Sequence, residues 1–462
     1  MPIRPLLNVL IVFVTIGLLL TVAYFGLERT YSIIRIMPKT ESQQKLISAL
    51  RREAFFDLQF MEISSDTSER HFNSFQLVVK PNQRDPLVRF LNTQASGIPY
   101  ELDRLSYSFK AWNAVLTNEM NKLYWVEDDE FDFGKHNSYQ SIVNKLHEHA
   151  AQQAGMAETF VLGKTHKNRE IIGIKIGRPQ NFKKRAFWID GGMHAREWVA
   201  IHAVMYYVDQ LLSEQQRRLT DSLDFYIIPV ANPDGYEYSR SSVDRRLWRK
   251  NLGPESCSET EKCCQGVDLN RNFDSFWGVA GASADPCEDI FKGSEPFSDP
   301  ESRQVQCMPL SARNFEFRSI RDKILSPELR GRVDGFITVH SFAQILAYPY
   351  QHTLFSRPID FLELHWVGVK AVQAMRNASG HVYQVGTATE LVKYPSSGGS
   401  QDWAKLKGGV KYSYCLELPP DNDPTAQGFM LAKEELKPIA EESWKGVEVI
   451  IGACVERQNK TE

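Results

Sequence analysis

The chain has 462 residues, of which 42% are hydrophobic and 24% are charged, and its formal net charge at pH 7 is −3. A chain of this length and composition can build one large domain with a sizeable core and a smaller domain besides, or three small domains. The slightly negative charge argues against nucleic acid as a main partner, because binding to phosphates needs a surplus of Lys and Arg.

An apolar segment with one early arginine opens the sequence, MPIRPLLNVLIVFVTIGLLLTVAYFG. If residues 1–23 are a signal peptide, cleavage follows Ala23, and Thr21 supplies the second small side chain of the processing site. If the segment is an uncleaved anchor, Leu6 to Phe25 provide the roughly 20 apolar residues that cross a bilayer. We expect a signal peptide and secretion, because a strand-like segment follows almost at once, and keep a membrane-anchored protein as the alternative.

Cysteine usage agrees with an oxidising compartment under either interpretation. The chain has seven cysteines, and an odd number leaves at least one without a partner in the same chain. Their spacing lacks the doubled CxxC of a structural zinc site. Acceptor sequences for N-glycosylation at Asn377 and Asn459 are compatible with secretion.

Residues 30–110 alternate short strands and helices. YSIIRIMP and FNSFQLVVKP have the pattern of strands, and TESQQKLISALRRE and RDPLVRFLNTQ that of helices. These elements predict a small α/β domain of roughly 80 residues. Residues 111–135 then hold a helical stretch with one lysine and the acidic EDDEFDFG, which we interpret as a connector.

A large α/β domain is predicted from about residue 136. A helix at SYQSIVNKLHEHAAQQ precedes a hairpin at FVLGKTHKNREIIGIKIG, and four apolar strands follow, RAFWID, LDFYIIPVA, VDGFITVH and VKYSYCLEL. Helices separate these strands, and a long helix closes the chain. Strands that are apolar on both faces predict a mixed sheet covered by helices on both sides.

His194 and Glu197 are the first candidates for chemistry. They lie three residues apart in DGGMHAREWVA, where a strand ends and the helix WVAIHAVMYYVDQLL begins. An imidazole and a carboxylate at this spacing can reach one metal ion, although H-x-x-E is a weak signal alone. A catalytic zinc site needs a third protein ligand and an open position for water. His340 in TVHSFAQ also ends a strand, where open α/β sheets place their ligands.

Further polar clusters accompany these ligands. Asn270 and Arg271 in VDLNRNFD pair an amide with a guanidinium, which fits a substrate carboxylate or simply a solvated turn. Arg249 follows a turn after a strand, where it borders a cleft or lies at the surface. Glu417 falls inside an apolar strand, where a lone carboxylate has to be paired or functional. Tyr394 lies in the Gly- and Ser-rich KYPSSGGSQDW, a composition that suits a mobile flap.

Together these motifs resemble the zinc metallocarboxypeptidases of the pancreatic type, the A/B subfamily. The match runs from about residue 136 to 455 through HAREW, NPDGY, RLWRK, GVDLNRNF, HSFAQILAYPY, SSGGSQDW and LEL, in order and spacing. The resemblance implies residues 28–115 as a propeptide that covers the active site in the zymogen. It further implies residues 116–135 as the activation connector and residues 136–462 as the catalytic domain.

The resemblance also implies a role for each candidate residue. His194, Glu197 and His340 match the zinc ligands, and Asp268 matches the carboxylate that hydrogen-bonds the first zinc histidine. Glu417 matches the general base, and Arg249 the arginine that stabilises the developing oxyanion. Asn270 and Arg271 match the clamp for the free C-terminal carboxylate of a peptide, Tyr394 the flap that closes over it, and Arg196 a further cleft arginine. Cys264 and Cys287 match a family disulfide, with adjacent Cys263 as a competitor.

The chain is therefore expected to be a monomeric zinc exopeptidase that acts on peptide or protein C-termini. Phe342 replaces the tyrosine of many relatives and Pro419 and Pro420 follow the general base, but each proposed catalytic group is present. The alternatives are a membrane-anchored peptide-processing enzyme and an inactive relative that binds peptides.

Specificity and activation follow from two further positions of the family pattern. Gln401 occupies the position that selects the C-terminal residue. Its neutral amide predicts an A-like preference for neutral residues, shifted toward polar or aromatic ones such as Asn, Gln and Tyr, and poor cleavage of Lys and Arg. Thr389 adds a hydroxyl to the same wall, and the alternative is that Gln351 supplies the deciding contact. A trypsin-like protease is expected to activate the zymogen after Lys110 or Lys122, because Ala111 to Phe133 contain no other basic residue than Lys122.

Overall fold

The structure is a computed structural model that describes residues 130–242, 245–258, 263–299, 320–421 and 426–461, and short stretches before residue 103. The chain divides into two compact units, Met1–Glu119 and Met120–Glu462. Their boundary falls within the segment predicted as a connector. The apolar segment at the start of the sequence, Lys110 and Lys122 lie outside the described residues. In the part that is described, no helix is both long and apolar enough to cross a membrane.

The first unit contains a four-stranded sheet with the order β2-β3-β1-β4. Its strands are β1 (Ser32–Ile36), β2 (Gln59–Ile63), β3 (Ser74–Val79) and β4 (Tyr100–Leu102). β1 pairs antiparallel with β3 and β4, and β3 pairs antiparallel with β2. β1 and β3 lie within the two strands that the sequence predicts, whereas most residues of the two predicted helices lie outside the described ranges.

The second unit is built on a mixed sheet, eight-stranded in the described residues, with the order β13-β12-β14-β11-β7-β8-β6-β5. Its strands are β5 (Ala157–Lys164), β6 (Glu170–Ile176), β7 (Arg185–Asp190), β8 (Leu223–Ile228), β11 (Val333–Ser341), β12 (Ile345–Tyr348), β13 (Gln384–Thr387) and β14 (Tyr412–Leu418). β8, β7, β11 and β14 run parallel through the middle, and the hairpin β5–β6 pairs antiparallel. The predicted mixed α/β sheet is confirmed.

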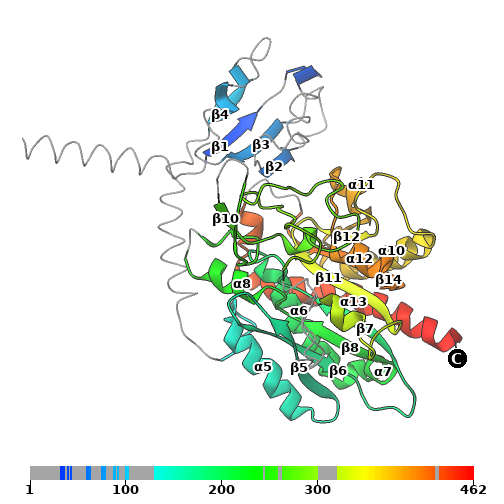
Figure 1. The fold of residues 1–462 in the computed structure, drawn as a ribbon. Helices are drawn as coiled ribbons and strands as arrows, with labels where there is room; N and C mark the ends of the chain where they lie inside the picture. The colour runs from blue at the N-terminus through cyan, green and yellow to red at the C-terminus, as the bar shows by residue number, and fades with distance from the viewer. Residues whose placement is uncertain are drawn as a thin grey trace, which may run out of the picture. The chain divides into compact units, whose positions relative to one another are not determined.

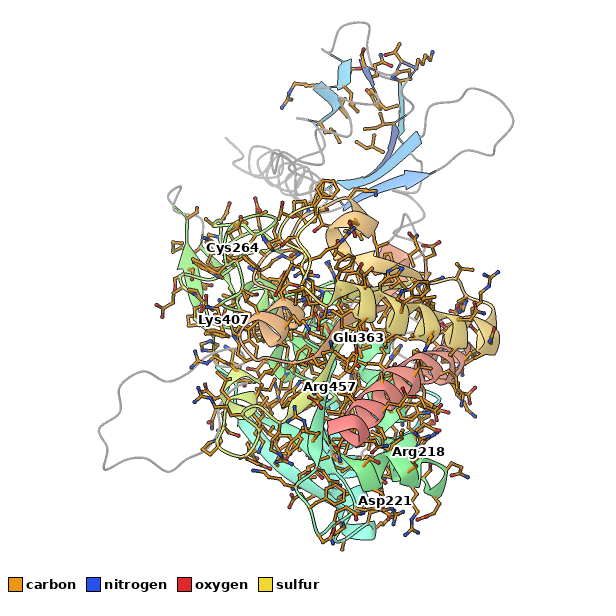
Figure 2. The ribbon with its side chains drawn as sticks, turned by 90° about the vertical axis from the view of Figure 1, so that its right-hand side faces the viewer. Arg218, Asp221, Cys264, Glu363, Lys407 and Arg457 are labelled. Atoms are coloured by element: carbon orange, nitrogen blue, oxygen red, sulfur yellow. A yellow bond between two sulfur atoms is a disulfide. The ribbon has the colours of Figure 1, made fainter. Side chains whose placement is uncertain are left out.

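Helices cover the sheet (Figure 1). They are α5 (Tyr139–Gln152), α6 (Trp198–Leu212), α7 (Arg217–Ser222), α8 (Pro233–Arg240), α9 (Ile320–Ile324), α10 (Phe361–Ser379), α11 (Ala388–Val392), α12 (Ser400–Leu406) and α13 (Lys433–Thr461). Short 3₁₀ turns lie at Glu214–Gln216, Leu269–Arg271 and Ala426–Phe429, and the two-stranded ribbon β9 (Glu255–Cys257) and β10 (Cys263–Gln265) stands apart. Figure 2 shows α10 and α13 side by side on one face.

The alternation of side chains along the central strands explains why both faces need cover. On β7, Trp188 belongs to the core that includes Trp403 of α12 and Ile324 of α9. Its neighbour Phe187 points to the opposite face, where a methyl group on Gly335 would meet both Phe187 and Cys454 of α13. Successive side chains of a strand point to opposite faces, so a strand that is apolar throughout is stable only between two covered layers.

The parallel strands end at one edge of the sheet, and this edge gathers the polar residues. β7 ends at Asp190, β11 at Ser341 and β14 at Leu418. The register pairs His340 of β11 directly with Glu417 of β14. The carboxyl edge of a parallel sheet is the usual place for a ligand in an open α/β fold.

Candidate metal centre and active site

Three side chains converge beyond the ends of β7 and β11. His194 lies in the loop after β7, Glu197 precedes the first residue of α6, and His340 lies near the end of β11. His194 Nδ1 is 2.7 Å from Glu197 Oε1, and His340 Nδ1 is 2.8 Å from Glu197 Oε2. The two Nδ1 atoms are 3.0 Å apart, and one ligand atom from each of the three residues lies within 4.8 Å of the others.

The two imidazoles are oriented through their other nitrogens. His194 Nε2 lies 3.1 Å from Oδ1 of buried Asp268, and His340 Nε2 lies 3.0 Å from Thr338 Oγ1. Thr338 donates in turn to Asp190 Oδ1 at 2.7 Å. Partners of this kind fix the ring orientation of metal-binding histidines and the nitrogen that is free to bind. In both rings, Nδ1 is therefore the nitrogen directed toward the shared centre.

This donor set fits zinc. Two imidazole nitrogens and one carboxylate, with no fourth protein ligand among the described residues, form the composition of a catalytic zinc site with an open position. All three side chains are buried. Burial alone would raise the pKa of Glu197, but His194 and His340 outweigh it and lower the pKa below its usual range. An anionic carboxylate between two imidazoles is the form that binds a divalent cation.

Glu417 stands beside this centre, opposite His340 on the neighbouring strand. The sequence predicts it as a buried carboxylate, but the structure leaves it only partly buried, because it lies one residue from the end of β14. Cys415 Sγ lies 3.9 Å from its Oε1. Burial raises the pKa of Glu417 to about 7, with the attraction of His340 opposing this rise. The side chain therefore combines access to solvent with a pKa close to neutrality.

Asp268 connects the metal centre to three cationic or amide groups. Its carboxylate accepts from Arg249 Nε at 2.9 Å and from the backbone N–H of Asn270 at 2.9 Å, and Arg271 NH1 lies 4.0 Å away. Arg249 NH1 also lies 3.6 Å from Glu197 Oε1. Burial alone would raise the pKa of Asp268, but Arg249 and His194 hold the pKa well below its usual range. Asp268 thus joins Arg249, Asn270 and Arg271 to the metal centre in one network.

Arg271 and Asn270 are held by backbone atoms. Arg271 Nε donates to the carbonyl of Gly281 at 2.8 Å, and its NH1 donates to the carbonyl of Asn270 at 3.0 Å. The Asn270 side-chain oxygen accepts from the N–H of Ser400 at 2.9 Å. These hydrogen bonds hold the Arg271 guanidinium and the Asn270 side-chain amide in fixed orientations. Both residues are buried rather than in a solvated turn, so the alternative interpretation of VDLNRNFD is wrong.

Tyr394 and Gln401 lie on the loop and helix that follow α11. Tyr394 is half-buried, one residue after Lys393, and Gln401 is the second residue of α12. Within the loop, Gly398 has φ +76°, and a Cβ there would lie 2.1 Å from the Arg271 carbonyl oxygen. Only glycine permits both the backbone conformation and this close approach. The loop therefore packs directly on the segment that carries Asn270 and Arg271.

Arg196 is more buried than the sequence analysis implies for an arginine of the cleft. It is buried, donates to the carbonyl of Leu247 at 3.3 Å and to Asp289 Oδ2 at 3.1 Å, and covers the ring of Phe429 at 4.6 Å. The sequence does not single out Asp289 or Phe429, because both contacts join distant segments. The sequence does not single out Asp190 either, because its one local signal is its position at the end of an apolar strand.

Two disulfides border this region. Cys264 is joined to Cys287, and Cys257 is joined to Cys263. Cys263 is therefore bonded to Cys257, a cysteine for which the sequence analysis predicted no partner. Cys415 and Cys454 are free and buried, and Cys307 lies outside the described residues. The Cys264–Cys287 bridge spans the segment that contains Asp268, Asn270 and Arg271.

The mixed sheet with a His–Glu–His centre at its carboxyl edge defines a metallopeptidase of the carboxypeptidase class. The family model described as zinc carboxypeptidase matches residues 142–446, and the chain belongs to this family. It is 31% identical to carboxypeptidase A2 of Mus musculus over 450 residues, which cover 94% of this chain and 97% of that protein. It is 35% identical to carboxypeptidase B of Astacus astacus, over 69% of this chain and 97% of that protein.

A solved structure gives the same fold. Carboxypeptidase A from Helicoverpa armigera superposes with a TM-score of 0.73 at 27% identity, covering 93% of this chain and 98% of that chain. The protein is thus a metallocarboxypeptidase, and His194, Glu197 and His340 are its zinc-binding residues. The disulfides and the likeness to carboxypeptidases support an extracellular location.

Proposed function

We propose that this protein removes single C-terminal residues with neutral side chains from peptides, with Glu417 as the general base, and that it is secreted as a zymogen. The observation that carries the proposal is the pairing of Glu417 with the zinc ligand His340 across two parallel strands. This register puts a carboxylate of raised pKa next to the metal centre.

The proposed chemistry divides between the metal and the side chains around it. Zinc, when bound, acidifies water and polarises a peptide carbonyl. Glu417 takes a proton from the attacking water and passes it to the nitrogen of the leaving residue. A carboxyl group with a pKa near neutrality suits both steps, because it accepts and releases the proton with little energetic loss.

Arg249 stabilises the negative charge that develops on the scissile carbonyl oxygen. Its guanidinium is held by Asp268 Oδ2 at 2.8 Å and lies near Glu197, so its orientation is set before substrate binds. A donor that is already positioned stabilises the transition state without the cost of reorganisation.

Asn270 and Arg271 bind the free carboxylate of the C-terminal residue, Tyr394 closes over it, and Arg196 contributes positive charge to the cleft. The guanidinium and the amide are both fixed on one side by backbone contacts. A clamp that needs a free carboxylate accepts chain ends and rejects internal peptide bonds, and so defines an exopeptidase.

Gln401 sets the preference among C-terminal residues. It is buried and neutral, so a charged substrate side chain placed against it lacks an ion partner there. Burying an unpaired ion costs several kcal/mol. We therefore expect Phe, Leu and other neutral residues to be removed in preference to Lys, Arg, Asp and Glu.

The first unit acts as the propeptide of a monomeric zymogen, which a trypsin-like protease activates by cutting the connector. The division of the chain at Glu119 and the similarity to carboxypeptidase A2 over almost the whole chain support this part of the proposal.

The decisive experiment compares the wild-type enzyme with Glu417→Gln on blocked dipeptides ending in Phe, after limited trypsin treatment. We expect Glu417→Gln to retain one zinc per chain and to lose turnover by about 10²–10⁴-fold. A chelator should abolish hydrolysis by the wild-type enzyme, and added zinc should restore it. A Glu417→Gln enzyme with zinc bound and near-normal kcat would overturn the assignment, and an inactive wild-type enzyme with zinc bound would favour a peptide-binding relative.

A further inference from the structure

Two buried glutamine side chains form a pair beneath the Gly- and Ser-rich loop. Gln351 follows β12, Gln401 lies in the first turn of α12, and both are buried. Gln401 Nε2 donates to Gln351 Oε1 at 2.7 Å. Fifty residues separate the two in sequence, so the fold alone brings the amides together.

The other polar atom of each amide has no hydrogen-bond partner among the described residues. These atoms are Gln351 Nε2 and Gln401 Oε1. Both converge beside Gly399, because a Cβ on this glycine would lie 2.1 Å from the former and 3.0 Å from the latter. Any side chain at position 399 would thus collide with these atoms, and with glycine there the two atoms lie side by side, buried and without a hydrogen-bond partner among the described residues.

The chemistry of the free pair does not depend on how the two amides are turned. Oxygen and nitrogen of an amide are assigned from the hydrogen-bond network rather than observed directly. However, a hydrogen bond between two amides always uses one donor and one acceptor. The two remaining atoms are therefore also one NH₂ donor and one carbonyl acceptor, whichever assignment holds.

A primary carboxamide satisfies such a pair because it carries its donor and its acceptor on one carbon, whereas the donor and acceptor nitrogens of a neutral imidazole point in diverging directions. A carboxylate would place an oxygen against the free carbonyl, and an ammonium or guanidinium would offer no acceptor to the free NH₂. A hydrocarbon would leave both atoms without partners, which costs about 1–3 kcal/mol per buried polar atom. If water occupies this place before the substrate binds, a hydrocarbon side chain is still unfavourable, because it displaces the water without replacing the hydrogen bonds that the water made to the two amides.

The pair adjoins the residues that the proposed function assigns to the terminal carboxylate. Ser400, next to Gln401, donates its N–H to Asn270 Oδ1 at 2.9 Å, and Gly398 packs on the carbonyl of Arg271. Thr389 donates its hydroxyl to the carbonyl of Gln351 and so holds the other residue of the pair against α11. Because of these contacts, we expect a substrate residue held by Asn270 and Arg271 to direct its side chain toward this region.

We propose that Gln351 and Gln401 act together as one amide-recognition unit that selects peptides with glutamine or asparagine at the C-terminus. This inference rests on the proposed function, because it takes the terminal carboxylate to bind at Asn270 and Arg271. The inference narrows the preferred C-terminal residues from neutral side chains in general to carboxamides. It also gives Gln351 the same weight as Gln401 in selecting the substrate.

The test uses the activated, zinc-loaded enzyme and blocked dipeptides that differ only in the last residue. Gln is compared with Met, which has similar length and no polar end, with Glu, which has the same shape and a charge, and with Phe and Lys. We expect kcat/KM for Gln to exceed that for Met and for Glu by about tenfold or more, the value of one or two satisfied hydrogen bonds.

Variants then connect the preference to the pair. Gln351→Met and Gln401→Met should each reduce the ratio of kcat/KM between Gln and Met substrates to about one, and the double variant should add little, because either change removes the unit. Gln373→Met, an exposed change on α10, is the matched control and should keep the wild-type ratio. The wild-type ratio is informative by itself if a variant fails to fold.

The outcomes separate the two proposals. If Met or Phe exceeds Gln, or if either glutamine variant keeps the wild-type ratio, the amide-recognition unit is wrong, while the neutral preference stands. If Lys or Glu is the best substrate, both the unit and the neutral preference are wrong. If zinc-loaded enzyme hydrolyses none of the substrates, the proposed function fails and the unit fails with it.

Discussion

Asp268 shows how one carboxylate can organise most of an active site. It accepts hydrogen bonds from Arg249 and from the Asn270 backbone and contacts His194 of the metal centre. The groups proposed to bind zinc, the oxyanion and the substrate carboxylate thus share one anchor. A change in any one of them alters the electrostatic field on the others, so substitutions within this network are expected to be non-additive.

Asp402 is a second buried carboxylate, and it gives a prediction on stability. It is fully buried, and Oδ2 accepts from the N–H of Gln351 at 2.9 Å. Burial raises the pKa of Asp402 from 3.8 to about 7, with the bond from Gln351 opposing the rise. The folded state therefore prefers the neutral acid. Its stabilising contribution is complete below pH 3.8 and is lost as the pH rises toward 7.

Asp402→Asn removes this titration while an amide oxygen can still accept from Gln351. We expect the free energy of unfolding of the variant, minus that of the wild type, to rise with pH between about 4 and 7 by about 1.4 kcal/mol per pH unit at most. Denaturation at a series of pH values from 5 to 8 measures the difference. Asp274→Asn, an exposed change beside Lys407, serves as control. Parallel profiles for the Asp402→Asn variant and the wild type would contradict the prediction.

At the scale of single residues, the sequence predicts which side chains take part in the chemistry, but not which other side chains they contact. His194, Glu197 and His340 stand out because they end or follow apolar strands, and the resemblance to a family assigned their roles. The pairing of Gln351 with Gln401, the contact of Arg196 with Asp289 and the chain from His340 to Asp190 join segments that only the sheet order brings together. Side-chain access is equally unpredictable, as the partly open Glu417 shows.

Among the elements, the long and periodic ones are the predictable ones. The sequence places α6 at its exact bounds, Trp198–Leu212, and the strands β7, β8, β11 and β14 within two or three residues. Their apolar runs are long enough to distinguish a strand from a helix. The strands β12 and β13 have four residues each and escape prediction, because so short a segment is fixed by its neighbours in the sheet rather than by its own pattern.

The Cys264–Cys287 disulfide gives a prediction about the loop segment after β10. The bridge has a sequence separation of 23, against 6 for Cys257–Cys263. In the chain-entropy model the larger loop stabilises the fold by about 3 kcal/mol and the smaller by about 2 kcal/mol. Replacing both cysteines of the larger bridge by alanine should therefore lower stability more than replacing both cysteines of the smaller one.

Thermal denaturation of the two double variants beside the wild type provides the measurement. The comparison is matched, since each variant loses two half-cystines and keeps the other bridge. Equal midpoints for the two variants would show that loop length does not determine the effect. Mass spectrometry of the unreduced wild-type protein, digested with a protease, should recover both pairs, and Cys264 found free or joined to Cys257 would reject the pairing itself.

The whole molecule divides its tasks between two units of different size. The larger unit contains the sheet, the zinc-binding residues and the proposed substrate clamp, and the match to the zinc carboxypeptidase family lies entirely within it. None of the described residues of the smaller unit belongs to this set. An enzyme whose catalytic groups all lie in one unit can dispense with the other for chemistry, which leaves inhibition, transport or folding as the task of the first unit.

We predict that cleavage after Lys110 or Lys122, close to the boundary of the two units, activates the enzyme. The segment from Ala111 to Phe133 contains Lys122 as its one basic residue, and Lys110 precedes it directly. A trypsin-like protease that cuts the connector therefore has these two positions. Limited trypsin treatment of the intact, zinc-loaded chain should raise the rate of hydrolysis of a blocked dipeptide ending in Phe in step with the loss of the full-length band. The N-terminus of the active form should be Ala111 or Leu123.

Variants at the two lysines test which peptide bond has to be cut and whether its cleavage causes the activation. Lys110→Gln and Lys122→Gln each remove one position, and the double variant removes both, while Lys145→Gln on α5 changes a lysine of the larger unit as the control. If the double variant is activated by trypsin as fast as the wild type, the connector is not the activating site. An active form that begins before residue 105 or after residue 140 would contradict the division proposed here. Full activity of the uncut chain would show instead that the first unit is no inhibitor and serves folding or transport.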